Sequence, residues 1–206
     1  MNFLAHLLLS GSDGDLRAGG FLGDFVRGPL TGQRPATIEA GIALHRHVDA
    51  SSDRAPPVRA AVALFPRPWR RWAPVALDVL FDHYLARDFG RWQQEPLPRF
   101  ADHCYGQLHA RRVHFTDPAL RFLDRMTEVD LLVAYAEPAS VGRALGHLSK
   151  RARRSNPLDD MASTLIDLEA PLHAAFMELL PSLQATASAW RAGGVKACRE
   201  SERPSR

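Results

Sequence analysis

Histidine and aspartate residues gather in apolar segments of the chain, a combination typical of metal sites in helical proteins. The segment 2–6 (NFLAH) ends at His6, and Asp24 follows in the sequence GDFVRG. The other two segments are 45–49 (HRHVD) and 77–85 (LDVLFDHYL). Carboxylate oxygen and imidazole nitrogen suit manganese, magnesium or iron(II), and the two cysteines of the chain are too few for a sulfur site.

The segment 77–85 places two acids on one helical face. Asp78 and Asp82 are four residues apart, and His83 lies about 100° further round a helix. The apolar neighbours predict that much of this helix is buried. A buried carboxylate needs a cation, a proton or a basic partner, and arginine pairing is the alternative to a metal here.

The other segments supply further ligands. His45 and Asp49 are also four residues apart and share a helical face, whereas His47 points elsewhere. His6 interrupts an apolar run, where it is either a metal ligand or a core histidine. Asp24 is either a ligand or an ordinary helix cap.

Helical bundles build metal sites from side chains on separate helices, so we expect these segments to converge on one divalent cation. The predicted metal ligands are His6, Asp24, His45, Asp49, Asp78, Asp82 and His83. The predicted catalytic residues are Asp24, His45, Asp82, His83 and Arg27. The sequence contains no P-loop, GxSxG, HExxH or dinucleotide-binding motif.

The elements that must position these residues are predicted to be helices. Amphipathic patterns predict helices over 38–51, 69–89, 99–113, 129–135, 139–151 and 158–190, the last broken near Pro171. Proline and glycine punctuate the chain between them, and alternating β-branched runs are nearly absent. We therefore expect an all-α protein with a single multi-helix domain over residues 1–190 and a disordered tail over 191–206.

Bulk properties narrow the class of protein. The 206 residues are 46% hydrophobic and 24% charged, as in an ordinary folded protein, and the net charge of +3 is mild for a nucleic-acid binder. The start MNFLAHLLLS has neither the basic region nor the cleavage site of a signal peptide, and no long apolar stretch predicts a membrane helix. We expect a cytoplasmic protein with free thiols, bound to neither nucleic acid nor membrane.

The chain resembles the acyl carrier protein phosphodiesterase family (acyl carrier protein hydrolases). The resemblance rests on MNFLAH at the start, GDFVRG around Asp24, GIALHRHVD around His45 and LDVLFDHYLARDF around Asp78, and it extends to about Trp190. That family is itself similar to the HD-type metal-dependent phosphohydrolases, which implies an HD-like helical fold. The order Asp82-His83 reverses the His-Asp dipeptide, so HD ligand roles are not transferred to these two residues.

The resemblance implies hydrolysis of the phosphodiester that joins 4'-phosphopantetheine to a serine of holo acyl carrier protein. It also implies a divalent cation, commonly manganese. Since the carrier protein is typically acidic, the basic segments 67–71 and 150–154 are candidates for steering it, through Arg67, Arg70, Arg71, Lys150, Arg151, Arg153 and Arg154. The alternatives are an HD-type phosphohydrolase acting on a nucleotide and a non-catalytic module that binds acyl carrier protein.

Overall fold

Proline marks the start of many helices in the computed structural model, which describes residues 1–152 and 155–201, with side chains to Gly193. It occupies one of the first two positions of α4, α5, α6, α7 and α8. Proline fits there because the first amides of a helix have no partner within the helix. The prolines at 56–57, 66–68, 96–98 and 118 therefore lie at helix starts.

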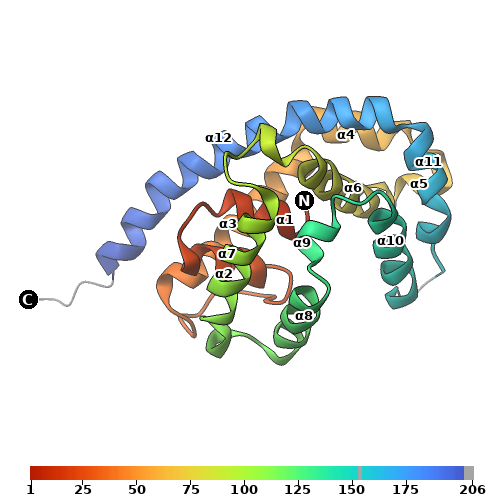
Figure 1. Ribbon diagram of the computed structural model, residues 1–206. Helices are drawn as coiled ribbons and strands as arrows, with labels where there is room; N and C mark the ends of the chain where they lie inside the picture. The colour runs from red at the N-terminus through yellow and green to blue at the C-terminus, as the bar shows by residue number, and fades with distance from the viewer. Residues whose placement is uncertain (153–154, 202–206) are drawn as a thin grey trace, which may run out of the picture.

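The described residues form helices and turns without a strand, which confirms the all-α prediction and a single domain. The α-helices are α1 (Phe3–Leu9), α2 (Gly14–Leu22), α3 (Ala36–Arg54), α4 (Pro56–Leu64), α5 (Arg67–Arg70), α6 (Ala73–Arg87), α7 (Leu97–His109), α8 (Asp117–Glu128), α9 (Leu131–Ala134), α10 (Ala139–Arg151), α11 (Met161–Asp167) and α12 (Glu169–Ser201) (Figure 1). Short 3-10 turns lie at Phe89–Arg91, Arg112–His114 and Leu158–Asp160.

The C-terminal helix extends beyond the boundary expected at residue 190. α12 lies along α3 and α4 (Figure 1) and continues to Ser201 through Pro181, so residues 191–201 of the expected tail are helical. Arg191 donates a hydrogen bond to the carbonyl of Leu9 at the end of α1. Residues 202–206 lie outside the described part of the chain.

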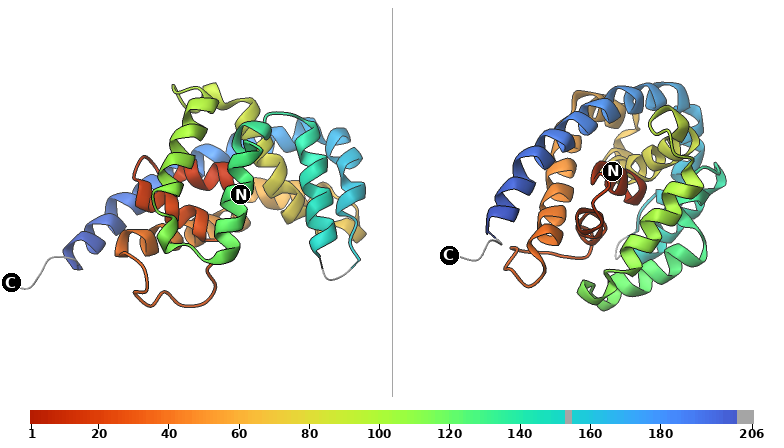
Figure 2. Two further views of the ribbon diagram at one scale, coloured as in Figure 1. Left: turned by 60° about the horizontal axis from the view of Figure 1, so that its bottom comes forward. Right: turned by 60° about the vertical axis from the view of Figure 1, so that its left-hand side comes forward.

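The apolar start of the chain forms a core helix. α1 lies near the centre of the molecule (Figure 2), where it packs against α2, α6 and α12, and every residue from Leu4 to Leu9 is buried. His6 is therefore held inside the protein, with 2% of its surface exposed. No described helix combines the length and the apolar character needed to cross a membrane.

Glycine residues let α2 and α3 come into backbone contact. A β-carbon added at Gly19 would overlap Ile38 and Gly41 of α3, and one added at Gly41 would overlap the carbonyl of Leu16 on α2. This close approach fixes the distance between the two helices. It brings the His45 side of α3 directly against the last turn of α2.

Candidate metal centre

Three of the predicted ligands meet between α1 and α3. Asp49 Oδ1 lies 3.0 Å from Nε2 of His6, and Asp49 Oδ2 lies 3.1 Å from Nε2 of His45. The two imidazole rings stack with their centroids 3.7 Å apart. One ligand atom from each of the three residues falls within 4.8 Å of the others, a spacing that one metal ion can bridge.

The orientation of His45 is set by α2. Nδ1 of His45 lies 2.8 Å from the carbonyl oxygen of Gly20, so this nitrogen carries the proton and donates it. Burial disfavours the charged imidazole, but the contacts with Asp49 outweigh burial and raise the pKa of His45. Nε2 therefore donates to Asp49 in the metal-free cluster, and a cation bound there would displace that proton. A β-carbon at Gly23 would overlap the His45 ring, so glycine is needed at that position.

The side chain of His6 has an unpartnered nitrogen. Its Nε2 is close to Asp49, but the orientation does not satisfy a hydrogen bond, and no other partner is found within the described residues. A buried polar atom without a partner is costly and calls for a specific explanation. A cation that accepts the lone pair of this nitrogen would supply one.

Burial and mutual charge shift the ionisation of the cluster. Burial, together with the neighbouring His45, lowers the pKa of His6 to about 4, so its imidazole is neutral at pH 7. Burial alone would raise the pKa of Asp49, but the hydrogen bond from His45 and the proximity of His6 hold it below its ordinary range. A neutral imidazole beside an ionised carboxylate is the state required for metal binding.

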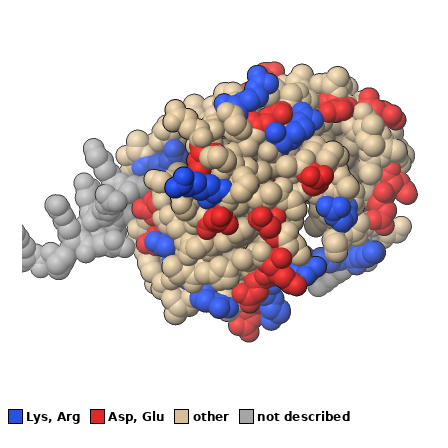
Figure 3. All heavy atoms as spheres, in the orientation of Figure 1, with Lys and Arg blue, Asp and Glu red and all other residues tan. Residues whose placement is uncertain are grey.

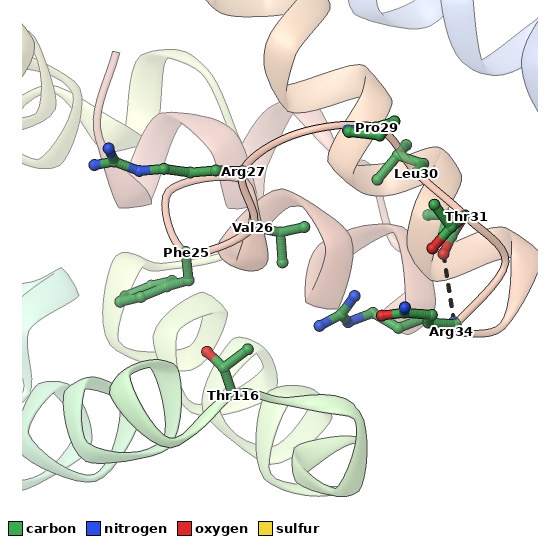
Figure 4. A pocket seen from close by; sticks show the side chains of 10 residues that line it. Phe25, Val26, Arg27, Pro29, Leu30, Thr31, Arg34 and Thr116 are labelled. Atoms are coloured by element: carbon green, nitrogen blue, oxygen red, sulfur yellow. Dashed lines mark hydrogen bonds between the residues drawn. The ribbon is translucent and has the colours of Figure 1, made fainter.

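Asp24 stands at the edge of this cluster. It follows the end of α2, its Oδ1 lies 3.9 Å from Nε2 of His45, and 47% of its side chain is exposed. Burial of its carboxyl raises the pKa of Asp24. Arg27 is an exposed residue of the same loop, and Figure 4 shows its side chain extending away from the other labelled side chains.

Asp78 projects toward the same region from α6. Its Oδ1 lies 2.6 Å from the amino group of Met1, and that amine lies 3.8 Å from Oδ1 of Asp49. The amine thus separates Asp78 from Asp49. The pKa of Asp78 is raised because burial outweighs the attraction of the amine.

Asp82 is fully buried and binds backbone amides at the start of α1. Its oxygens accept from the amides of Leu4 at 2.7 Å, Ala5 at 3.2 Å and Asn2 at 3.3 Å. Burial raises the pKa of Asp82 to about 7 despite these donors. Both oxygens are therefore occupied in orienting the helix that carries His6.

His83 faces a different element. Its Nδ1 donates to the carbonyl of Tyr135 at 2.7 Å, and the Tyr135 hydroxyl accepts from the side chain of Asn2 at 3.2 Å. The structure thus joins His6, His45 and Asp49, keeps Asp24 and Asp78 nearby, and places Asp82 and His83 on supporting contacts. Among the described residues, none of these acids pairs with an arginine.

Sequence reasoning missed the groups that support the cluster. The Gly20 carbonyl, the space at Gly23 and the hydroxyl of Tyr135 were not among the predicted residues. Gly23 carried a signal, because it directly precedes Asp24 in the GDFVRG segment. The backbone partners of Asp82 and His83 carry none, since any residue type offers an amide and a carbonyl.

Comparison with known proteins identifies the relatives of this chain. A family model described as acyl carrier protein phosphodiesterase matches residues 1–183. A protein of that name from Serratia proteamaculans is 37% identical over 178 residues, covering 84% of this chain and 89% of its own. One from Shigella boydii is 33% identical over 195 residues, covering 91% and 98%. One from Yersinia pestis is 34% identical over 188 residues, covering 89% and 95%.

No solved structure matches the chain, so the expected likeness to the HD-type fold has no structural neighbour to support it. The family match, in contrast, spans all the segments on which the site is built, from α1 to α6. The chain therefore belongs to the acyl carrier protein phosphodiesterase family.

Proposed function

We propose that this protein hydrolyses the phosphodiester between 4'-phosphopantetheine and a serine of holo acyl carrier protein. The products are apo acyl carrier protein and free 4'-phosphopantetheine. The observation that carries the proposal is the convergence of His6, His45 and Asp49, with Asp24 beside them. Family membership supplies the substrate class, since the relatives are named for a phosphodiesterase acting on this carrier.

The proposed cation is divalent and is held by Nε2 of His6, Nε2 of His45 and the carboxylate of Asp49. Manganese is expected, with magnesium and iron(II) as alternatives, because the ligands are nitrogen and oxygen. The unpartnered Nε2 of His6 and the fixed tautomer of His45 fit such an ion. When bound, it would neutralise charge on the phosphodiester and make a neighbouring water more acidic.

Asp24 is the proposed proton carrier. The water oxygen attacks phosphorus, the bond from phosphorus to the serine oxygen breaks, and the phosphate leaves on the pantetheine product. Asp24 takes a proton from the attacking water and returns one to the serine oxygen. About half of its side chain is exposed and so accessible to a protein substrate, while partial burial raises the pKa of Asp24 above its ordinary value.

The other predicted residues take supporting roles in this proposal. Arg27 is free to hold a nonbridging oxygen, as a charged donor suited to phosphate. Asp78 neutralises the Met1 amine beside Asp49. Asp82 and His83 position α1 and the Tyr135 segment through backbone contacts, and we assign them no direct contact with the cation.

Surface charge gives limited support for steering by basic residues. On the face shown in Figure 3, acidic and basic side chains of the described residues are interspersed. Arg70 donates hydrogen bonds to the carbonyls of Ala63 and Phe65, whereas Lys150 and Arg151 are exposed. Arg153 and Arg154 lie outside the described residues. Carrier recognition is therefore proposed to depend on local contacts more than on a long-range field.

The test is incubation with holo acyl carrier protein and manganese, followed by intact mass measurement of the carrier. The expected result is loss of the whole prosthetic group, phosphate included, with little loss in a His45→Gln variant. His147→Gln is the matched control, because His147 is exposed on α10 and, among the described residues, bonds only to its own helix. A carrier mass that stays unchanged with each of the three metals, while the enzyme is folded, would contradict the proposal. Cleavage of nucleotides instead would favour a nucleotide phosphohydrolase.

A further inference from the structure

A pocket of about 390 Å³ lies in the loop between α2 and α3, within the range of about 300–1,000 Å³ typical of small-molecule sites. Its walls come from the loop, from Glu39 in the first turn of α3 and from Thr116 at the start of α8. Figure 4 shows Phe25, Val26, Arg34 and Thr116 arranged around a common space. Among the described residues that line it, the reaction proposed above uses Arg27 alone.

The pocket begins where the proposed catalytic centre ends. Asp24, 3.9 Å from Nε2 of His45, is followed directly by Phe25 in the pocket wall. The loop is fixed to α3 at the neighbouring position, because Arg46 donates to the carbonyl of Val26 at 2.9 Å. A substrate with its phosphodiester at the cluster thus has this pocket beside it.

The apolar wall is preformed. Phe25 packs against Phe21 with ring centroids 5.2 Å apart, against Phe122 at 5.7 Å and against Phe3 at 6.3 Å. These rings come from α1, α2 and α8 and join the loop to the core. Such a wall can receive a branched aliphatic group without rearrangement of the loop.

The polar lining includes an unpartnered hydroxyl. Thr116 occupies the N-cap position of α8, yet its side chain makes no capping bond, and its buried Oγ1 has no partner in the described part of the chain. Arg34 crosses the pocket and donates from Nε to the carbonyl of His114 at 3.1 Å. The carboxylate of Glu39 accepts from the backbone amides of Gly32 and Arg34. With Arg27 also in the lining, the pocket offers hydroxyl and guanidinium donors to the oxygens of a polar ligand.

We propose that this pocket binds the pantetheine arm of the substrate, an inference that rests on the proposed function. The arm is uncharged beyond its phosphate and carries a geminal dimethyl group, a hydroxyl and two amides. The dimethyl group packs on Phe25, Val26 and Leu30. An amide carbonyl accepts from Thr116 or Arg34. The pocket thereby recognises the prosthetic group, while the cluster of His6, His45 and Asp49 acts on the phosphodiester.

The test uses pantetheine, which lacks the phosphate, as the calorimetric ligand of the full chain. Thr116→Val removes the hydroxyl at constant shape and should weaken binding about two- to tenfold. Leu30→Trp fills the pocket and should weaken it on the order of tenfold or more. Thr164→Val on α11 and the exposed Leu64→Trp on α4 are the matched controls and should bind as wild type does.

The same variants are then assayed for kcat/KM with holo acyl carrier protein, where the pocket variants should fall and the controls should not. The inference would be overturned if the wild type did not bind pantetheine, or if the pocket variants bound it as tightly as the wild type. Selective binding of adenosine monophosphate in the pocket would overturn it as well. Failure of the wild type to cleave the carrier would overturn the proposed function. Cleavage that survives both pocket variants unchanged would overturn the pocket assignment alone.

Discussion

Replacing Asp82 with asparagine tests whether this residue anchors α1 or binds the metal. The Asp82 oxygens accept three backbone amides in a fully buried place. Asparagine has one acceptor oxygen, so at least one of these amides loses its partner and meets an NH2 group. A buried donor left unsatisfied costs about 1–3 kcal/mol. For a chain of this length, we expect the melting temperature to fall by about 2–12 °C.

The assay is a thermal melt of wild type and Asp82→Asn, each with and without manganese. The expected loss is equal in both conditions, and the stabilisation by manganese stays near the wild-type value. Asp49→Asn is the comparison, because it should remove most of the manganese effect, which is about 2.7 kcal/mol at a hundredfold excess over Kd. An Asp82→Asn protein with an unchanged metal-free melt and no response to manganese would refute the anchoring role.

The pH dependence of the stability of wild type and Asp82→Asn gives an independent check on the role of Asp82. Because burial raises its pKa to about 7, above the ordinary 3.8, the folded protein binds this proton more tightly than the unfolded chain. The Asp82 contribution to wild-type stability therefore grows as the pH falls from about 7 to about 4. The deficit of Asp82→Asn should widen over that interval. A deficit that narrows toward acid would show that the carboxylate is stabilised as the anion.

Other predictions follow from the same geometry. Exhaustive chelation should abolish carrier cleavage and manganese should restore it; activity that persists after verified metal removal would remove the metal from the mechanism. Gly23→Ala should weaken manganese binding because its β-carbon displaces His45, whereas Gly142→Ala, in open space on α10, should raise stability by about 0.5–1 kcal/mol without changing metal affinity. Cys104, whose thiol has a pKa raised to about 12 by burial, should resist iodoacetamide at pH 8 until the protein unfolds, as peptide mass mapping would show.

Helical spacing predicted which side chains share a face, but not what they meet. His45 and Asp49 lie on one face of α3 and contact each other, as the four-residue interval indicates. Asp78 and Asp82 on α6 also point the same way, since both reach the start of α1. Their partners are an amine and backbone amides. These groups have no signature in the residue types on which the metal hypothesis was based.

Element boundaries show the same limit. The patterns 38–51 and 99–113 predicted the core of α3 and most of α7, whereas no helix was predicted where α4 lies. The expected helix 69–89 divides into α5 and α6, and the helix over 117–128 was missed, although its spacing is strongly amphipathic. α12 continues through Pro181 because its contacts with α3 and α4 outweigh the tendency of proline to end a helix. Those contacts cannot be read from the local sequence.

The three proposed ligands differ in how folding brings them to the site. His45 and Asp49 are neighbours on one helix, so formation of α3 alone places them together. His6 reaches them only when α1 docks in the core, and Asp82 fixes the start of that helix through its amides. Docking of α1 therefore completes the site. Because a cation bound by all three residues favours the docked state, metal binding and the packing of α1 should stabilise each other.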